Sequence, residues 1–165
     1  MSAKNIILIT ILCFLFIGGA YFLVAGENKP EVKIIAYSAS DKEKPVLEVK
    51  ETLIDIGKMK VSDEKEAIFT IKNIGTKPLQ LYNMTSSCNC TFGQLIYNKK
   101  TSKEFGMHLA SDYLDDIAPN TEAKVKVIYR PSIMPVYGPV ERELYISTND
   151  PNKTKLVLQI KTVVQ

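Results

Sequence analysis

Apolar and polar residues alternate with a period of two through most of the chain beyond residue 45. The clearest run is 123–130, in which Val125 and Val127 alternate with Lys124 and Lys126. Such alternation is typical of a strand with one buried face, so the valines are predicted to face a core and the lysines to face solvent. The same pattern predicts strands over residues 46–50, 53–57, 67–72, 79–84, 141–147 and 155–164.

About seven such strands, separated by turns, predict an all-β domain over residues 45–165, built as an immunoglobulin-like two-sheet β-sandwich. Ile71 is predicted to lie in its core, and the last strand is predicted to bury Leu156, Leu158 and Ile160 opposite the two valines. Roughly 120 residues are enough for one independent hydrophobic core.

Residues 92–116 interrupt this pattern. No regular alternation runs through them, and residues 98–103 form a hydrophilic stretch. We therefore predict one long loop over 92–116 within the sandwich. Loops of this length are uncommon in compact domains and often carry function.

Residues 6–25 form an uncharged apolar run of 20 residues. A helix of that length spans roughly 30 Å, the thickness of the hydrocarbon core of a bilayer, so the run predicts one transmembrane helix within a membrane anchor over residues 1–26. Lys4 favours a cytoplasmic N-terminus, which makes the chain a single-pass protein of the cell membrane with an extracytoplasmic domain. The segment Val24-Ala25-Gly26 also fits a cleavage site, so a cleaved signal peptide stays open as an alternative.

Residues 27–44 are predicted to form a solvated tether between the membrane anchor and the sandwich. They are rich in Lys, Glu and Ser and show no sustained periodicity. Within this tether, residues 32–37 are a candidate edge strand.

Charge and composition exclude several classes of function. The chain has 21 Lys and Arg against 18 Asp and Glu, and no basic run exceeds two residues, so nothing indicates a nucleic-acid partner. Ser62 and Lys65 have the spacing of a Ser-x-x-Lys pair but sit in a polar turn without a supporting motif. With a single histidine and no phosphate-binding glycine loop, we predict that the chain is not an enzyme and uses no cofactor.

Six short segments follow one another along the chain, at 69–75, 79–81, 87–91, 117–120, 128–130 and 146–151. In this order and spacing they resemble a bacterial family known as domain of unknown function 1573. That family is similar to immunoglobulin-like domains of the Hydin and major-sperm-protein type, which serve mainly as interaction modules. Two positions depart from the pattern, since Asn89 and Asn120 stand where the family usually has glycine. Both exchanges are mild because asparagine tolerates a positive φ angle.

Cys88 and Cys90 are the most distinctive candidate site. Residues i and i+2 of a strand face the same side, so both sulfurs are predicted to point to one spot. One interpretation is structural, with two buried thiols or a disulfide on the oxidising side of the membrane. A redox pair is a second, although oxidoreductases usually space their cysteines by two residues at a helix start.

A third interpretation adds Met107 and His108 to Cys88 and Cys90 as ligands of Cu(I), which prefers soft sulfur donors. The copper-delivery factor of cytochrome oxidase combines the same parts, namely a membrane anchor, an immunoglobulin-like domain and a Cys-x-Cys pair. We therefore predict a membrane-tethered, extracytoplasmic module that binds another protein, with copper binding or delivery as the alternative.

Overall fold

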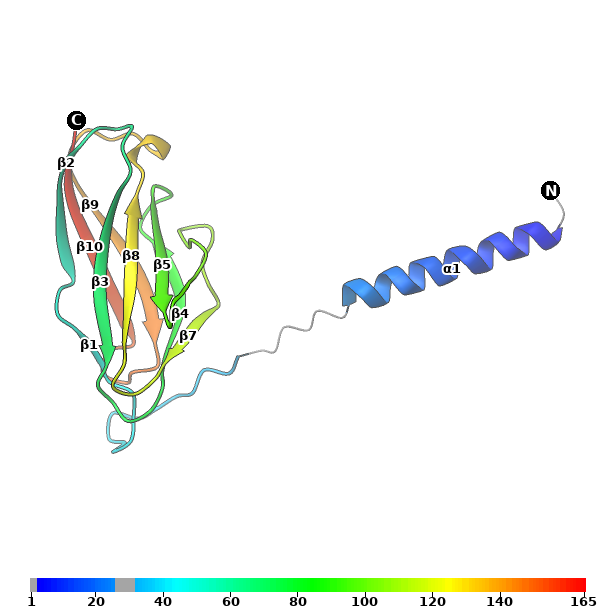
Figure 1. The fold of residues 1–165 in the computed structure, drawn as a ribbon, viewed down its shortest axis with the longest axis horizontal. Helices are drawn as coiled ribbons and strands as arrows, with labels where there is room; N and C mark the ends of the chain where they lie inside the picture. The colour runs from blue at the N-terminus through cyan, green and yellow to red at the C-terminus, as the bar shows by residue number, and fades with distance from the viewer. Residues whose placement is uncertain (1–2, 26–31) are drawn as a thin grey trace. The chain divides into compact units, whose positions relative to one another are not determined.

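The computed structural model describes residues 3–25 and 32–165. The chain divides into two compact units, Met1–Lys33 and Ile34–Gln165. The first unit contains the helix α1 (Ala3–Ala25), and the second contains the strands (Figure 1). Part of the predicted tether, residues 27–31, lies outside the described residues.

Among the helices of the described residues, none is both long and apolar enough to cross a membrane. The transmembrane helix predicted for residues 6–25 is therefore not confirmed. The candidate edge strand over 32–37 is not formed either, although the N–H of Ile35 donates a hydrogen bond to the Gln80 side chain at 2.6 Å.

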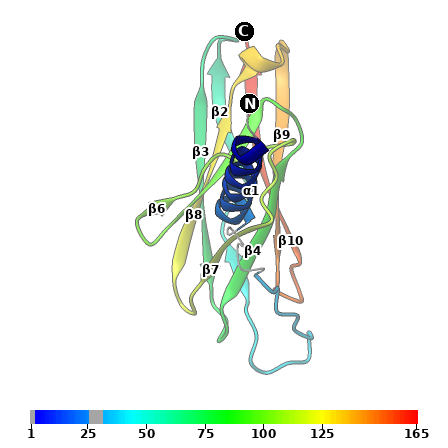
Figure 2. The same cartoon turned by 90° about the vertical axis from the view of Figure 1, so that its right-hand side faces the viewer.

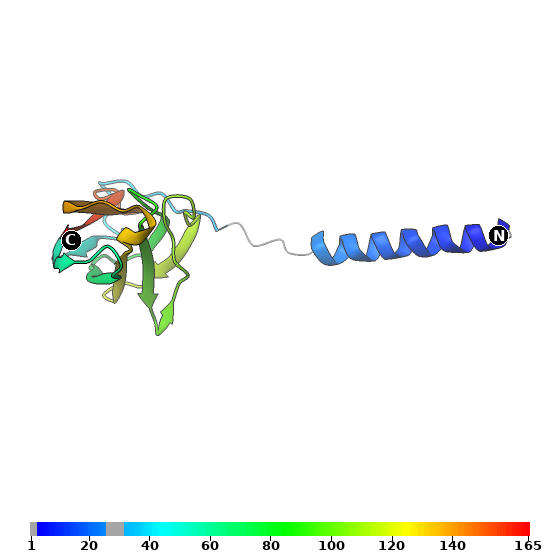
Figure 3. The same ribbon diagram turned by 90° about the horizontal axis from the view of Figure 1, so that it is seen from above.

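Two five-stranded sheets form the second unit. The first sheet has the order β1 (Leu47–Val49), β3 (Lys65–Asn73), β8 (Glu122–Tyr129), β5 (Thr91–Tyr97) and β6 (Lys100–Thr101). The second has the order β2 (Leu53–Met59), β10 (Lys155–Val164), β9 (Gly138–Thr148), β4 (Leu79–Ser86) and β7 (Tyr113–Ile117). Neighbouring strands are antiparallel except β2 and β10, which are parallel. Figure 3 looks along the strands of this sandwich.

The predicted two-sheet sandwich and its strand register are confirmed. Ile71, Val125 and Val127 are fully buried in the first sheet, while Lys124 is exposed. From the facing sheet, Leu156, Leu158 and Ile160 enter the same apolar core. Burial of alternate residues on two facing sheets is the main source of stability in such a fold.

The prediction of one long loop over 92–116 is wrong, because β5 and β6 occupy its first part and most of β7 its last. The alternation in β5 is hard to see because its inward positions include Gly93, which has no side chain. A Cβ atom at Gly93 would lie 2.6 Å from the Met84 sulfur and 2.7 Å from the Leu144 methyl groups, so the side chains of β4 and β9 fill the space that a side chain at residue 93 would take.

The segment after β5 folds back and covers the edge of the first sheet. Ser102 donates its N–H to the Leu95 carbonyl at 2.9 Å, and Gly93 and Phe105 exchange two backbone hydrogen bonds of 2.8 and 2.9 Å. The hairpin that carries β6 projects from this edge (Figure 2). Pairing of this kind covers an edge strand that would otherwise expose its N–H and C=O groups.

At one end of the sandwich, the residues that carry the family resemblance have structural roles. A Cβ at Gly75 would lie 2.3 Å from the Lys44 carbonyl oxygen, so only glycine fits. The Asp150 carboxylate is buried and accepts the N–H of Leu47 at 2.8 Å. Asn120 adopts the expected positive φ of 58°, whereas Asn89 does not. This end, where the chain enters the sandwich, is therefore braced by turns and backbone contacts.

Candidate functional site

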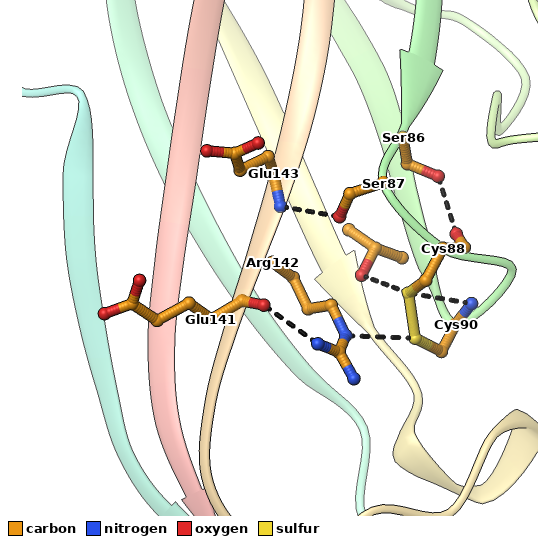
Figure 4. The surroundings of a disulfide bond; sticks show 8 residues. Ser86, Ser87, Cys88, Cys90, Glu141, Arg142 and Glu143 are labelled. Carbon is orange, nitrogen blue, oxygen red and sulfur yellow. Dashed lines mark hydrogen bonds between the residues drawn. A yellow bond between two sulfur atoms is a disulfide. The ribbon is translucent and has the colours of Figure 1, made fainter.

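The turn that contains the two cysteines connects β4 with β5 at the opposite end of the sandwich. The N–H of Thr91 donates to the Cys88 carbonyl at 3.4 Å, and the Ser86 hydroxyl donates to the same oxygen at 2.7 Å. Cys88 and Cys90 form a disulfide with their Cα atoms 5.3 Å apart (Figure 4). In this structure the pair is therefore in its oxidised state.

Both sheets hold this turn in place. The N–H of Ser87 donates to the Glu143 carbonyl of β9 at 2.9 Å, and the N–H of Glu143 returns a hydrogen bond to the Ser87 hydroxyl at 3.0 Å. The Cys90 carbonyl accepts the N–H of Arg130, just after β8, at 2.8 Å. Because β8 and β9 belong to different sheets, the turn closes this end of the sandwich.

Hydrogen-bond donors surround the two sulfur atoms. Arg142 of β9 directs its Nε toward the Cys90 sulfur at 3.4 Å, as Figure 4 shows. The Cys88 sulfur accepts the N–H of Cys90 at 3.2 Å and contacts the Thr91 hydroxyl at 3.3 Å. Cys90 is fully buried, whereas Cys88 keeps 8% of its surface exposed. Both cysteines are therefore buried residues, and Cys88 is the less deeply buried of the two.

Met107 and His108 lie in a tight turn beside the cysteine turn. Gly106 and Leu109 exchange backbone hydrogen bonds of 3.2 and 3.1 Å, and both Met107 and His108 are exposed. Residues 106–109 line a hollow together with Asn89 and Phe92. The structure thus brings the two predicted ligands next to the residue between the cysteines.

Among the described residues, the hydrogen-bond partners of the two sulfurs are Thr91, the Cys90 N–H and Arg142, and neither Met107 nor His108 is one of them. In the part of the chain that the structure describes, no group of three or more His, Cys, Asp or Glu residues could hold a metal ion. A metal ion bound by Cys90 would also be repelled by the positively charged Arg142 guanidinium beside that sulfur. The copper site stays a prediction, and it would require reduction of the disulfide.

Arg130 fixes the segment after β6 to this end. Its guanidinium forms two hydrogen bonds to the Glu104 carboxylate at 2.6 and 2.8 Å, pairs with Glu64, and stacks over the Phe92 ring at 4.9 Å. The hydrogen bonds from Arg130 hold the pKa of Glu104 below its ordinary value, against the smaller effect of burial. The same pairs raise the pKa of Arg130.

The connection between β8 and β9 exposes a group of apolar side chains that the sequence analysis missed. It begins with the short 3-10 helix η1 (Pro131–Ile133) and continues to Gly138. The exposed residues are Ile133, Met134, Val136 and Tyr137, with 41–70% of their surface accessible; together they are called the apolar tip. The signal was present as an apolar run, 133–137, at a position where the alternation stops.

The apolar tip is linked to the cysteine turn through the backbone of Arg130. The N–H of Arg130 binds the Cys90 carbonyl, and its own carbonyl accepts the N–H of Ile133 at 3.2 Å. Figure 1 shows η1 at the same end as the C-terminus, opposite the end where the chain enters the sandwich. Grouped exposed apolar residues on a soluble domain often indicate an interaction site.

Comparison with known proteins identifies the family. The model of the HYDIN/CFA65/VesB-like Ig-like domain matches residues 45–162. The chain belongs to this family. The match supports the immunoglobulin-like part of the predicted resemblance, whereas the assignment to domain of unknown function 1573 stays a prediction. No curated protein matches the chain.

Solved structures share the fold at low sequence identity. A protein of unknown function from Porphyromonas gingivalis W83 is 17% identical with a TM-score of 0.57, and the match covers 82% of this chain and 51% of that one. A family 123 glycoside hydrolase from Clostridium perfringens is 12% identical with a TM-score of 0.51, over 69% of this chain and 23% of the enzyme. The PapD-like domain 7 of human CEP192 is 14% identical, with a TM-score of 0.48 over 84% of this chain and 96% of that domain.

This chain thus spans about half the length of the Porphyromonas protein and less than a quarter of the hydrolase. These similarities show the fold alone. The immunoglobulin-like fold of this family suggests a protein-interaction module.

Proposed function

We propose that this chain is a protein-binding module that works outside the cytoplasm and docks a partner protein through the apolar tip. The observation that carries the proposal is the exposure of Ile133, Met134, Val136 and Tyr137 in one short connection. Leaving such side chains in water costs free energy that a partner would recover by covering them. The expected partner presents an apolar depression with a polar rim.

The setting of the apolar tip favours binding. Aromatic residues and Met are enriched at protein interfaces, and Tyr137, with 70% of its surface exposed, would serve as an anchor. The connection starts from Arg130, which is held by Cys90, Glu104 and Glu64. A rigid base reduces the conformational entropy lost on binding.

The disulfide supports a location in an oxidising compartment, because disulfides persist outside the cytoplasm and are rare within it. An apolar N-terminal segment such as α1 would then act in export.

Site-specific photo-crosslinking in the native host tests this proposal. A photoreactive residue at Tyr137 should give one discrete adduct with another protein, identified by mass spectrometry. The matched control is the same residue at Lys124, exposed on the outer face of the first sheet. The adduct should disappear when Ile133→Ser and Val136→Ser are added. Equal adducts at positions 137 and 124, or none at 137, would contradict the proposal.

A further inference from the structure

We propose that Cys88–Cys90 is a reversible thiol–disulfide exchange site for a dithiol, and that Arg142 positions and stabilises the sulfur that leaves. This activity goes beyond partner binding and does not depend on it. The inference rests on the surroundings of the two sulfur atoms, the different depth of burial of the two cysteines, and the lack of an anionic partner for Arg142.

Arg142 is a half-buried cation without an anionic partner. It lies on the inner face of β9, where its neighbours Val140 and Leu144 are buried. Within residues 32–165, no salt bridge to Arg142 is formed. Its contacts are the Cys90 sulfur at 3.4 Å, the Glu141 carbonyl at 2.9 Å and the Tyr129 ring, whose centroid lies 5.8 Å away.

The carboxylates nearest in sequence do not neutralise Arg142, because they point to the other face of β9 (Figure 4). Glu141 pairs there with Lys161 at 3.0 Å, and Glu143 accepts the Tyr145 hydroxyl. A partly buried cation is unfavourable until an anion approaches it. Reduction of the disulfide would create that anion, a thiolate at Cys90, in direct contact with the guanidinium.

The hydrogen-bond donors around Cys88 also favour the reduced state of the pair. The N–H of Cys90 and the hydroxyl of Thr91 both lie within hydrogen-bond distance of its sulfur and would stabilise a thiolate there. Groups that stabilise the reduced form make a disulfide a better oxidant. A ring of three residues also restricts the unfolded chain very little, so the bond adds little stability of the kind that long disulfide loops provide.

The depth of burial determines which sulfur is attacked. Both cysteines are buried, but the Cys88 residue retains an exposed fraction of 8%, and Cys90 has none. One thiolate of the dithiol attacks the Cys88 sulfur and forms a mixed disulfide, while the bond to Cys90 breaks and its electron pair stays on Cys90 as a thiolate beside Arg142. A leaving sulfur that is stabilised as a thiolate departs faster.

The second sulfur of the dithiol completes the exchange. As a thiolate it attacks its own partner sulfur in the mixed disulfide, and Cys88 leaves as a thiolate. The dithiol has then lost two electrons and two protons and become a disulfide. The protein has gained the two electrons, and its thiolates take up protons from water.

The first experiment measures how easily the full chain is reduced. Samples are equilibrated in mixtures of reduced and oxidised dithiothreitol, and their free thiols are alkylated. The fraction of reduced protein is then measured by mass spectrometry. Arg142→Met should lower the equilibrium constant for reduction about tenfold, the change expected for one unit in the pKa of a thiol. Arg142→Lys, which keeps the charge, should stay closer to the wild type than Arg142→Met does. Lys161→Met, which removes a cation from the outer face of β10, should change nothing.

Equal reduction of the wild type and Arg142→Met, with both proteins folded by their thermal transitions, would overturn the proposal. So would a disulfide that dithiothreitol reduces only in denaturant. The Arg142→Lys result keeps the test valid if Arg142→Met is unstable.

The second experiment tests the order of attack. In the Cys90→Ser variant, oxidised glutathione should form a mixed disulfide at Cys88 in the native protein. In Cys88→Ser, the adduct at Cys90 should form at least about tenfold more slowly, because Cys90 is the more deeply buried residue. The reverse order of rates would overturn the assignment of Cys90 as the leaving sulfur.

Discussion

At the scale of single residues, the end of the sandwich that carries the disulfide buries polar groups next to apolar ones, among them Ser86 and Thr91. Tyr129 is fully buried there, and among the described residues its hydroxyl is a buried side-chain oxygen without a hydrogen-bond partner. Its ring packs beneath Arg142, and its strand position is opposite Thr91, which contacts Cys88. Buried polar groups without a hydrogen-bond partner cost free energy and are rare, so removal of this hydroxyl tests whether it has a partner.

We expect Tyr129→Phe to leave the free energy of unfolding unchanged or to raise it by up to about 1 kcal/mol, because it removes a desolvated hydroxyl that gains no hydrogen bond. Chemical denaturation measures the effect. The matched control is Tyr97→Phe, which loses the bond from the Ala118 N–H at 3.0 Å and the contact with the Thr121 hydroxyl at 3.1 Å. Tyr97→Phe should destabilise the domain by about 1 kcal/mol. A larger loss from Tyr129→Phe than from Tyr97→Phe would show that Tyr129 has a partner.

Copper titration of the reduced chain tests the alternative ligand set. If Cu(I) binds, Cys88→Ser with Cys90→Ser should abolish uptake while the fold survives, and His108→Ala should weaken it by a measurable factor. Elemental analysis after anaerobic purification measures the bound metal. Equal uptake by the wild type and the double variant would end the copper hypothesis.

At the scale of elements, strands with a clean alternation take the register that their pattern predicts, and segments without it are placed by contacts. The segment after β6 is the clearest example. Backbone bonds from Ser102 and Phe105 hold it to β5, and Glu104 ties it to Arg130 after β8. Charge pairs and edge pairing therefore order a stretch whose composition resembles a loop.

The register of β3 and β8 predicts how charged substitutions act. Ile71→Asp and Val127→Asp should each prevent folding, because an unpaired buried charge costs several kcal/mol against a total stability of roughly 5–15 kcal/mol. Lys124→Asp should be tolerated, since residue 124 is exposed. Far-ultraviolet circular dichroism and thermal unfolding measure both outcomes. Tolerance of Val127→Asp together with loss of folding in Lys124→Asp would mean a register shift of one residue.

The Arg130–Glu104 pair predicts a pH dependence of stability. Hydrogen bonds from Arg130 lower the pKa of Glu104 in the folded protein below its ordinary value of 4.5. A lowered pKa means that the folded state binds the proton less readily than the unfolded state. The stabilisation is therefore complete above the ordinary pKa and is lost as the pH falls through the folded value.

The free energy of unfolding of Glu104→Gln should consequently fall less than that of the wild type as the pH is lowered below 5. The difference should be about 1 kcal/mol or less because the pair is partly exposed. Denaturant titrations at several pH values measure it. The matched control is Glu122→Gln, whose carboxylate is more exposed and lies 3.8 Å from Lys72. Identical pH profiles for Glu104→Gln and the wild type would exclude a stabilising role for the pair.

At the scale of the whole molecule, the two ends of the sandwich differ in character. The end where the chain enters is closed by Gly75, where a side chain would meet the backbone, and by Asp150, which accepts the N–H of Leu47. The other end combines the apolar tip with the disulfide and Arg142. We therefore expect partner binding and thiol exchange at the end away from the N-terminal segment of the sandwich.

Export of the chain can be tested directly. A reporter that is active only outside the cytoplasm, fused after Gln165, should be active, because a disulfide requires an oxidising compartment. Washing membranes with alkaline carbonate then separates a membrane-held chain from a released one and so tests the predicted anchor. An inactive reporter would contradict the extracytoplasmic location.

The sequence by itself determined the β-sandwich, because a period of two fixes which side chains of each strand are buried, as Val125, Val127 and Lys124 illustrate. It also predicted that the sulfurs of Cys88 and Cys90 point to one spot, on the argument of a strand, whereas the two residues lie in a turn. Only the tertiary structure decided that β5 runs through a segment without visible alternation, since the space inward of Gly93 is filled by Met84 and Leu144 from other strands. The approach of Arg142 to Cys90 joins residues 52 positions apart in the chain, and such contacts depend on how the sheets pack and not on any local pattern.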